Sequence, residues 1–422
     1  MKIRQLEVRD FRGFKALKIL FPEAPNNLAV FVGINGSGKT SVLEGIVRVV
    51  RVFLRLSEAD YLDDITHFNQ HYNSNNIKKG AEEAYLSTEI EYGNMGVFDA
   101  EERILKVHTT ANNTSGEGDA SITRGMKDRE KEAFKKKLFT FIYYPTERFV
   151  KDHPDLKSIP LNQLDRWSAL EQSMAKQIDF SSFFNWYRSI EDIENEEIRF
   201  TKNTEYREKE LEAVRRAIRT FLPNVSNPRI QRQPWEEFVV EKNGERLSIS
   251  NLSHGERLVF AMIGDIARRL SIANPDLENP LEGEGIVLID EIELHLHPGW
   301  QRQIVPSLTR TFPNIQFIIT THSPQVISSV VRESVFLLEN FQLRGIPASL
   351  GRDSNAILEE VFMVPERPDD IRKKLERVYA LMEQPEKMEE AKALLQEIEQ
   401  TYEVSRDEDI LQAKMHLEFL EE

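Results

Sequence analysis

Three short stretches of the sequence carry side chains whose types and spacing suit phosphate chemistry. The first is GINGSGKT at residues 33–40, which follows an apolar run and fits the pattern G-x-x-x-x-G-K-[ST]. Its glycines let backbone N–H groups turn inward around phosphates, its lysine can reach the β- and γ-phosphates, and its hydroxyl can bind Mg²⁺. We therefore predict a nucleotide-binding loop made of Asn35, Gly36, Ser37, Gly38, Lys39, Thr40 and Ser41.

The other two stretches are apolar runs that end in polar residues. GIVLIDE ends in Asp290, the expected magnesium ligand with Thr40, and in Glu291, which is placed to polarise an attacking water. FIITTHSPQ ends in His322, which can touch a γ-phosphate or its water. We predict Lys39, Glu291 and His322 as catalytic residues. The alternatives are an ordinary strand end for the carboxylates and a structural role for the histidine.

The stretch LSHGER at residues 252–257 opens an expected helix. Ser253 and Gly255 at a helix start form a second anion site, and Glu256 follows them. One nucleotide needs only one phosphate loop, so the second site suggests a γ-phosphate that belongs to another subunit. Without its context, the same stretch would be only a helix cap.

These residues are far apart in the sequence, so strands and helices must position them close together. Residues 2–9 and 28–32 have strand patterns, a helix is expected over 39–56, and residues 84–110 alternate like an antiparallel sheet. The runs GIVLID and IQFIITT are continuously apolar, which favours a parallel sheet covered on both faces. The expected fold is α/β. We predict that the α/β part has an N-terminal lobe at 1–110 and a C-terminal lobe at 236–345. Between the lobes we predict an inserted helical lid or short arm at 111–235, and after them a helical tail at 346–422.

Composition bounds the possible functions. The 422 residues include no cysteine, which excludes disulfides and thiol catalysis, and no apolar run is long enough to span a membrane. A formal net charge of -15 argues against whole-surface attraction to nucleic acid. The N-terminus lacks the apolar segment of a signal peptide, so a cytoplasmic protein is expected.

The order of these motifs is similar to a known family. FRGF, GINGSGKT, LSHGE, an apolar strand ending in DE, and TTHS resemble the ABC-type ATPase heads of the SMC, RecF and OLD families, and DEIELHLHPGWQ resembles the OLD-like branch. The resemblance implies ATP and Mg²⁺ as cofactors and two heads that sandwich two ATPs, with each signature serine completing the other subunit's site. It also implies that Arg12 contacts a phosphate or adenine; the alternative is a surface arginine on a β-turn.

Other parts of the chain are similar to a more specific group of these ATPases. YYPTER, FSSFFNWYRSIEDIENEE and LGRDSNAILEEVF are similar to PtuA-like ATPase subunits of Septu and retron anti-phage systems. That resemblance implies an ATPase that scaffolds and restrains or activates a separately encoded nuclease of HNH type. No TOPRIM-like nuclease module is expected after residue 340, and the glutamine that links Mg²⁺ to the lobe interface cannot be placed. The alternatives are a RecF/SMC-like DNA repair or recombination clamp and, more weakly, a transporter ATPase subunit.

Three segments keep two or more interpretations. Asp290, Glu291, Glu293, His295 and His297 could form a transition-metal site, although their spacing favours a loop directed at a second subunit. The basic segment 124–137 could contact a nucleic-acid backbone or be a solvated helix face. The C-terminal helices could pack on the head, pair between subunits or hold the nuclease.

Overall fold

The computed structural model describes residues 1–22, 27–56, 77–91, 104–112, 120–122, 139–148, 166–175, 178, 180–346, 348–365, 367–402 and 407–421. The chain forms two compact units, which we call the head (Met1–Arg352) and the tail (Asp353–Glu422). The tail therefore begins a few residues later than the sequence predicted.

A six-stranded sheet forms the centre of the head, in the order β14-β13-β3-β12-β11-β7. Five of these strands are parallel, and β14 pairs antiparallel at the edge. Every residue of β3, β11 and β12 is buried, as the continuous apolar runs predicted. The strands are β3 (Leu28–Val32), β7 (Thr140–Tyr144), β11 (Gly285–Ile289), β12 (Ile315–Thr321), β13 (Val335–Glu339) and β14 (Gln342–Arg344).

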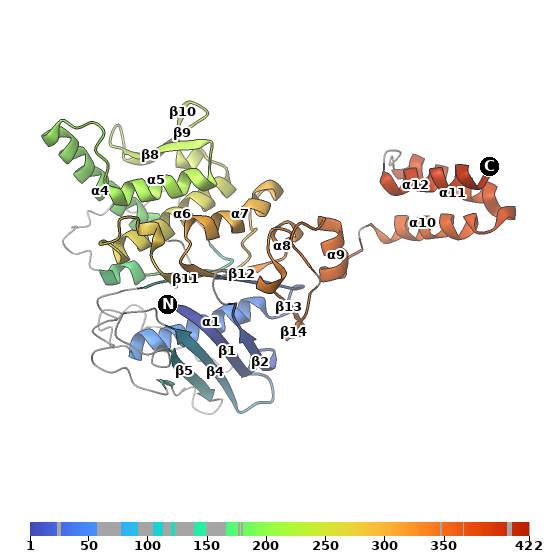
Figure 1. The fold of residues 1–422 in the computed structure, drawn as a ribbon, viewed down its shortest axis with the longest axis horizontal. Coiled ribbons are helices and arrows are strands. Elements are labelled where there is room, and N and C mark those ends of the chain that lie inside the picture. The colour runs from blue at the N-terminus through green and yellow to red at the C-terminus, as the bar shows by residue number, and fades with distance from the viewer. Residues whose placement is uncertain are drawn as a thin grey trace. The chain divides into compact units, whose positions relative to one another are not determined.

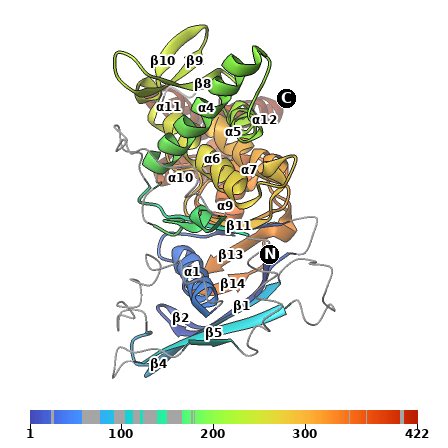
Figure 2. The ribbon, with the colours of Figure 1, turned by 90° about the vertical axis from the view of Figure 1, so that its left-hand side faces the viewer.

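Helix α1 (Lys39–Leu56) is packed between this central sheet and a second, antiparallel sheet (Figures 1 and 2). The second sheet has the order β2-β1-β4-β5-β6. One hydrophobic core joins all three layers, including Leu6 of β1, Ile46 and Phe53 of α1, and Ile318 of β12. The strands of the second sheet are β1 (Lys2–Phe11), β2 (Phe14–Leu20), β4 (Glu83–Glu91), β5 (Ile104–Asn112) and β6 (Ala120–Ile122).

Helices cover the other face of the central sheet (Figure 1). Helix α6 (His254–Ala273) is buried over nearly its whole length and contacts α4 (Phe180–Thr201), α5 (Lys209–Phe221) and strand β7 of the central sheet. A three-stranded sheet of β8 (Val225–Gln231), β9 (Glu237–Lys242) and β10 (Glu245–Ser248) joins α4 and α5 on this side. Helices α7 (Pro298–Thr311) and α8 (Pro324–Ile327) follow β11 and β12.

The predicted insertion at 111–235 is wrong in one respect. Strand β7 belongs to the central sheet, because Thr140–Tyr144 pairs in parallel register with Gly285–Ile289 of β11. A strand is assigned to a sheet by a partner distant in sequence, here some 145 positions away, so local composition could not reveal it. Strands β2 and β8 were also not predicted; the latter contains Asn227 and Pro228, which are uncommon inside strands.

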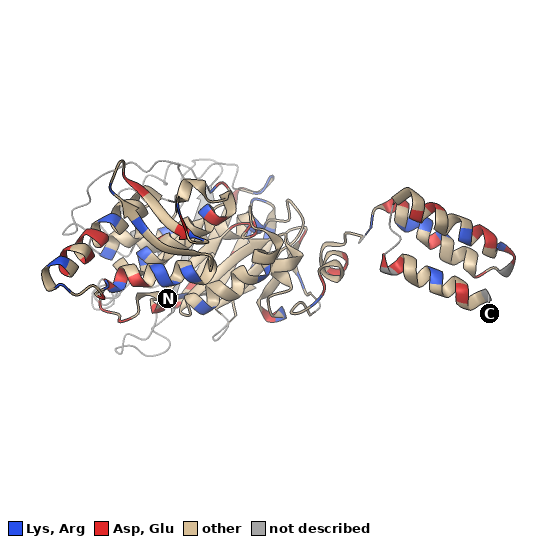
Figure 3. Cartoon of the chain, turned by 90° about the horizontal axis from the view of Figure 1, so that it is seen from above, with Lys and Arg blue, Asp and Glu red and all other residues tan. Residues whose placement is uncertain are grey.

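The tail is entirely helical and has its own hydrophobic core. Helices α10 (Asp369–Met382), α11 (Met388–Tyr402) and α12 (Glu408–Glu421) bury apolar residues against one another, and α9 (Ser354–Phe362) precedes them. Both acidic and basic residues lie along these helices (Figure 3). Several form ion pairs between helices, such as Lys374–Glu397 and Lys414–Glu399. Across the described helices of both units, none combines the length and the apolar character that crossing a bilayer requires.

Candidate functional site: a phosphate pocket at the edge of the central sheet

The predicted phosphate loop connects β3 to α1. Gly33, Gly36 and Gly38 have positive φ angles of 149°, 79° and 105°. A Cβ atom on Gly33 would lie 2.2 Å from the carbonyl oxygen of Leu338, and one on Gly38 would lie 2.6 Å from the ring of Phe14. The loop therefore needs glycine for its backbone angles and, at these two positions, for space.

Lys39 is the first residue of α1 and is 6% exposed. Its ammonium group donates hydrogen bonds to the carbonyl oxygens of Gly33 (2.9 Å) and Ile34 (3.0 Å), so it lies inside the loop. Burial lowers its pKa to about 8, although the carboxylates of Asp290, Glu291 and Glu293 oppose the shift. A phosphate group would replace part of the lost hydration and stabilise the charged amine.

Thr40 and Asp290 form the oxygen pair that the sequence assigned to a metal. The Thr40 hydroxyl donates to one carboxylate oxygen of Asp290 (2.9 Å), and Thr320 donates to the other (2.5 Å). Asp290 is 1% exposed and follows β11 directly. Hydroxyl and carboxylate oxygens are the hard donors that Mg²⁺ prefers, and they adjoin the loop that can take the phosphates. The side chains present therefore fit a magnesium–nucleotide complex.

Glu291 and His322 complete this edge of the sheet. Glu291 has a left-handed backbone (φ 48°), and its N–H donates to the Thr320 hydroxyl at 2.7 Å. Burial lowers the pKa of His322, and the nearby Lys39 adds to the shift, which favours a neutral imidazole. The backbone N–H of His322 donates to Glu293 (2.5 Å), a carboxyl whose pKa is raised by burial.

These groups converge on a pocket of about 270 Å³. Of the predicted residues, Arg12, Glu291, His322 and all the loop residues except Ser37 line it together. Arg12 donates to the Ser41 hydroxyl (3.2 Å) and to Glu44, so it is attached to α1 rather than free on a turn. The lining residues are Arg12, Gly13, Asn35, Gly36, Gly38, Lys39, Thr40, Ser41, Glu291, His322 and Phe341.

One predicted loop residue, Ser37, does not line the pocket, and one pocket residue was missed. Ser37 is buried, and its N–H donates to the Ile34 carbonyl (3.2 Å), so it shapes the loop. Phe341 was not predicted; it lies on the turn between β13 and β14, with its ring 5.2 Å from that of Phe14 and at a steep angle to it. The only hint in the sequence is an aromatic residue in the Glu-Asn-Phe-Gln turn after an apolar strand.

The signature residues Ser253, Gly255 and Glu256 are not among the described residues that line the pocket. Ser253 is exposed at the N-cap of α6 and forms a capping box with Glu256. One Glu256 oxygen accepts from the Ser253 N–H (3.0 Å) and hydroxyl (2.8 Å), and the other pairs with Lys242 (2.7 Å). Burial alone would raise the pKa of Glu256, but the bonds from Lys242 and Ser253 together lower it. The geometry favours a helix-organising role for Glu256 over the predicted nucleotide contact.

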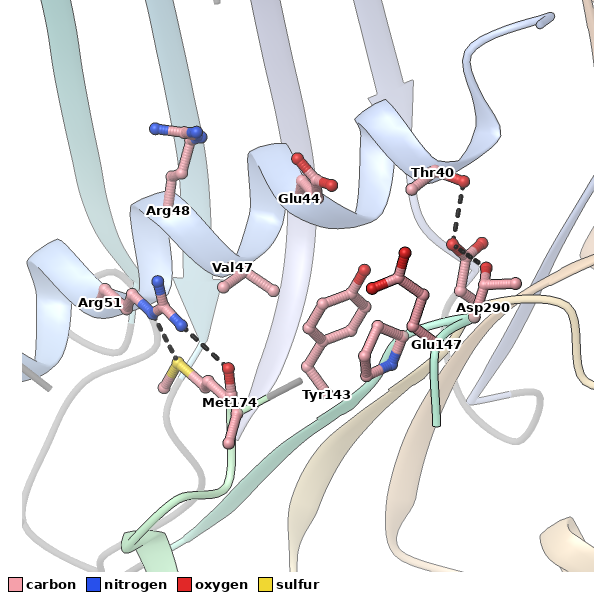
Figure 4. Close-up of a pocket in the computed structure, with 12 residues that line it drawn as sticks. Thr40, Glu44, Val47, Arg48, Arg51, Tyr143, Glu147, Met174 and Asp290 are labelled. Carbon is pink, nitrogen blue, oxygen red and sulfur yellow. Dashed lines mark hydrogen bonds between the residues drawn. The ribbon is translucent and has the colours of Figure 1, made fainter. Parts of the chain in front are cut away.

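A second and larger cavity, about 420 Å³, also reaches Thr40 and Asp290 (Figure 4). It lies between α1 and the end of β7, and Glu44, Arg48, Arg51, Tyr143 and Glu147 are among the residues that line it. Burial, with the neighbouring charge of Arg48, lowers the pKa of Arg51 to about 10.

Sequence reasoning gave no role to the turn that leaves β7 beside this cavity. The Thr146 hydroxyl donates to the same Asp290 oxygen as Thr40, also at 2.9 Å. Arg148 donates to the backbone carbonyls of Asp290 and Glu291. The stretch YYPTER did show a strand that ends in proline and polar residues, but nothing in it indicated that Asp290 lies opposite.

The alternative transition-metal site receives no support. Within the part of the chain that the structure describes, no group of three or more histidine and carboxylate side chains is arranged to hold a metal ion. His295 instead packs edge-on against His254 at 4.3 Å between ring centres, and its carbonyl oxygen would lie 2.4 Å from a Cβ on Gly255. The loop after Glu291 thus touches the start of α6. The basic segment 124–137 lies outside the described residues.

This edge of the sheet can accommodate a triphosphate, its metal and an attacking water, so the head is that of a P-loop ATPase. The chain belongs to the family described as "AAA domain, putative AbiEii toxin, Type IV TA system", whose model matches residues 28–328. The predicted fold class, an α/β P-loop head with a helical tail, is confirmed.

Curated relatives are similar over most of the chain. "Retron Ec83 probable ATPase" of Escherichia coli is 31% identical over 88% of this chain and 78% of its own length. "Retron Vc95 probable ATPase" of Vibrio cholerae is 31% identical over 82% and 74%. "Septu protein PtuA" of Bacillus thuringiensis is 22% identical over 80% and 75%. The predicted resemblance to retron and Septu ATPases is confirmed. Among solved structures, an SMC head bound to the C-winged helix domain of ScpA is 16% identical over 83% of this chain and 98% of its own, with a TM-score of 0.49.

Proposed function

We propose that this protein is the ATP-hydrolysing subunit of a bacterial anti-phage defence complex. It works as an ATP-sandwich dimer that scaffolds, and restrains or activates, a separately encoded nuclease. The observation that carries the dimer is the separation between the pocket, which is lined by loop residues, Glu291 and His322, and the signature residue Ser253, which is exposed. The names of the retron and Septu relatives support the setting in a defence system.

Each side chain has a defined task in hydrolysis. Lys39 and the loop N–H groups bind the β- and γ-phosphates, and Thr40 with Asp290 holds Mg²⁺. Bound there, Mg²⁺ neutralises phosphate charge that develops during cleavage. Glu291 accepts a proton from the attacking water, and neutral His322 donates a hydrogen bond toward the γ-phosphate. Arg12 and Phe341 also line the pocket, and we assign them to the nucleoside part of the nucleotide.

The absence of α6 residues from the described pocket lining supports the proposed dimer. Among the described lining residues, none comes from α6, although Ser253 and His254 at the start of that helix are exposed to solvent. A second head would bring its Ser253 and Gly255 to the γ-phosphate, which is the use that a helix start offers to an anion. The loop after Glu291, packed on Gly255, would connect the two sites.

The described residues supply ATP chemistry, and nuclease activity is assigned to the partner subunit. We place partner or oligomer contacts on the tail, because it has a core of its own and its charged helices can be recognised as a module. The helices inserted before β8 act as a compact lid or short arm on α6.

Mixing two inactive variants tests the shared site. Lys39→Ala removes the phosphate contact, and Ser253→Arg blocks the signature. Each variant alone should hydrolyse little ATP. Their mixture should regain up to about one quarter of wild-type sites, since half of randomly paired dimers are mixed and each mixed dimer has one intact site.

The same variants separate binding from assembly. Lys39→Ala should weaken ATP binding about 100-fold, because the phosphates would lose their charged partner in the pocket. Ser253→Arg should bind ATP normally. Lys18→Ala, an exposed lysine of β2, is the control. No recovery in the mixture, or full activity of Ser253→Arg alone, would refute the shared site.

The partner is tested by recovering the Glu291→Gln protein from its native host with ATP and Mg²⁺ and identifying bound proteins by mass spectrometry. A stoichiometric nuclease that also needs residues 353–422 would support the defence scaffold. Nucleic acid with repair factors, and no nuclease, would instead favour a RecF/SMC-like clamp.

A further inference from the structure

Among the buried arginines that the structure describes, Arg148 directs its guanidinium group to backbone carbonyls, whereas Arg268 and Arg269 pair with the carboxylate of Asp265. It follows β7 within the turn Pro145–Arg148 and is 4% exposed. One terminal nitrogen donates to the carbonyl oxygen of Asp290, and the other donates to that of Glu291 at 2.7 Å. Arg148 thus holds two successive peptide carbonyls with the two prongs of one planar group.

These two carbonyls belong to the residues that matter most for hydrolysis. Glu291 has φ 48°, a left-handed conformation that costs a residue with a Cβ roughly 1–2 kcal/mol. Such a conformation persists only when its surroundings fix it. Here the Glu291 N–H is held by the Thr320 hydroxyl at 2.7 Å, and its carbonyl is held by Arg148. The Glu291 backbone is therefore fixed from both sides.

The charge of Arg148 fits the same task. Burial lowers its pKa, while Asp290, Glu293 and Glu291 raise it. The guanidinium stays protonated because its ordinary pKa lies far above neutrality. It also places a fixed positive charge behind the metal-binding carboxylate without occupying that carboxylate's oxygens.

We propose that Arg148 is a positioning residue for ATP hydrolysis. By holding the carbonyls of Asp290 and Glu291, it fixes the left-handed turn that directs the Glu291 side chain into the nucleotide pocket. It does not touch the nucleotide: the described lining of that pocket includes Glu291 but not Arg148. The inference rests on the proposed role of Glu291 as the base, and it links β7 to the site through a side chain.

The test compares Arg148→Lys and Arg148→Ala with wild type, measuring the dissociation constant for ATP and kcat separately. A lysine keeps the charge but has one nitrogen in place of the two terminal nitrogens of the planar guanidinium, so it does not reproduce the spacing and direction of the two donors. We expect the ATP dissociation constant to stay within about twofold while kcat falls about 10- to 100-fold, the cost of misplacing a catalytic group by about an ångström. If Arg148→Ala fails to fold, the kinetics of Arg148→Lys alone test the positioning role.

Arg215→Lys is the matched control. Arg215 is also largely buried and two-pronged, donating to both oxygens of Glu194 at 3.0 and 2.8 Å, but it lies on α5 away from the pocket lining. It should lose stability without a fall in kcat. A kcat for Arg148→Lys within twofold of wild type would overturn the proposal, and so would a parallel loss of ATP binding and hydrolysis.

Glu291→Gln distinguishes this failure from failure of the proposed function. If Glu291→Gln abolishes hydrolysis while Arg148→Lys does not change it, only the positioning role falls. If neither changes hydrolysis, the base itself is misassigned and both proposals fall.

Discussion

Helices α1 and α6 both begin at a glycine-containing turn with hydroxyl side chains, yet their first turns differ in charge. The first turn of α1 contains no acidic residue, and its lysine lies inside the loop. The first turn of α6 contains Glu256, whose carboxylate caps the Ser253 N–H and pairs with Lys242. A helix start attracts anions only to the extent that its own side chains have not already compensated it.

Because of this difference, the start of α1 can bind an anion within one chain, whereas the start of α6 is already compensated by its own side chains. The α1 start is ready for a triphosphate without any help from a partner. At the α6 start, Glu256 orders the helix, and Lys242 balances a negative charge that would otherwise repel a phosphate. In the free subunit, the residues at the start of α6 therefore stabilise the helix, and their contact with a second subunit's phosphate belongs to the proposed dimer.

The largest expected effect concerns the α1 side. Glu291→Gln should reduce kcat about 10²- to 10⁴-fold, because a glutamine cannot accept the proton of the attacking water. ATP binding should persist, since the loop and Asp290 are unchanged, and size-exclusion chromatography with ATP should show a trapped dimer. Phosphate-release kinetics provide the measurement, with exposed Glu333→Gln as control. Hydrolysis at the wild-type rate would disprove the assignment.

A smaller effect should distinguish the two helix starts by pH. The charged form of Lys39 binds phosphate and its pKa is about 8, so ATP affinity should fall by up to about tenfold per pH unit above that value. Isothermal titration between pH 7 and 9.5 measures this dependence. Lys39→Arg is the control, because its guanidinium does not titrate in that range. An affinity for the wild-type protein that is independent of pH would contradict the buried-lysine interpretation.

The stability of the ligand-free protein should respond with the opposite sign. Between about pH 8 and the ordinary lysine pKa of 10.5, the unfolded chain binds a proton at Lys39 that the folded chain does not. The contribution of Lys39 to the free energy of unfolding therefore rises with pH across this window.

The smallest effect concerns the α6 side. Glu256→Ala removes half of the capping box and should lower the free energy of unfolding by about 1 kcal/mol while leaving ATP binding to the free subunit unchanged. Denaturant melts and ATP titration measure the two quantities. Asp353→Ala removes a cap from α9 in the tail and serves as control, since Asp353 accepts from the Asn355 N–H at 2.8 Å. Loss of ATP binding in Glu256→Ala would restore the nucleotide contact predicted from the sequence.

The sequence predicted what depends on neighbouring residues. GINGSGKT carries its glycines, lysine and hydroxyl within eight positions, and GIVLIDE states both a buried strand and its terminal carboxylates. Thr146, Arg148 and Phe341 could not be placed in the same way, because their partners come from other strands. The extent of the lid was misjudged for the same reason: β7 is defined by its pairing with β11.

Helix α1 carries a consequence for how this protein can diverge. Side chains along it, such as Val42, Ile46, Val50 and Phe53, are fully buried between two sheets. Each contributes about 1.5–3 kcal/mol, and enlarging any of them would force two layers apart. Few substitutions should therefore be tolerated along α1, the helix that begins with Lys39 and Thr40. Variation in nucleotide preference should therefore accumulate on the turns that carry Arg12 and Phe341, which also line the pocket, while α1 stays nearly fixed.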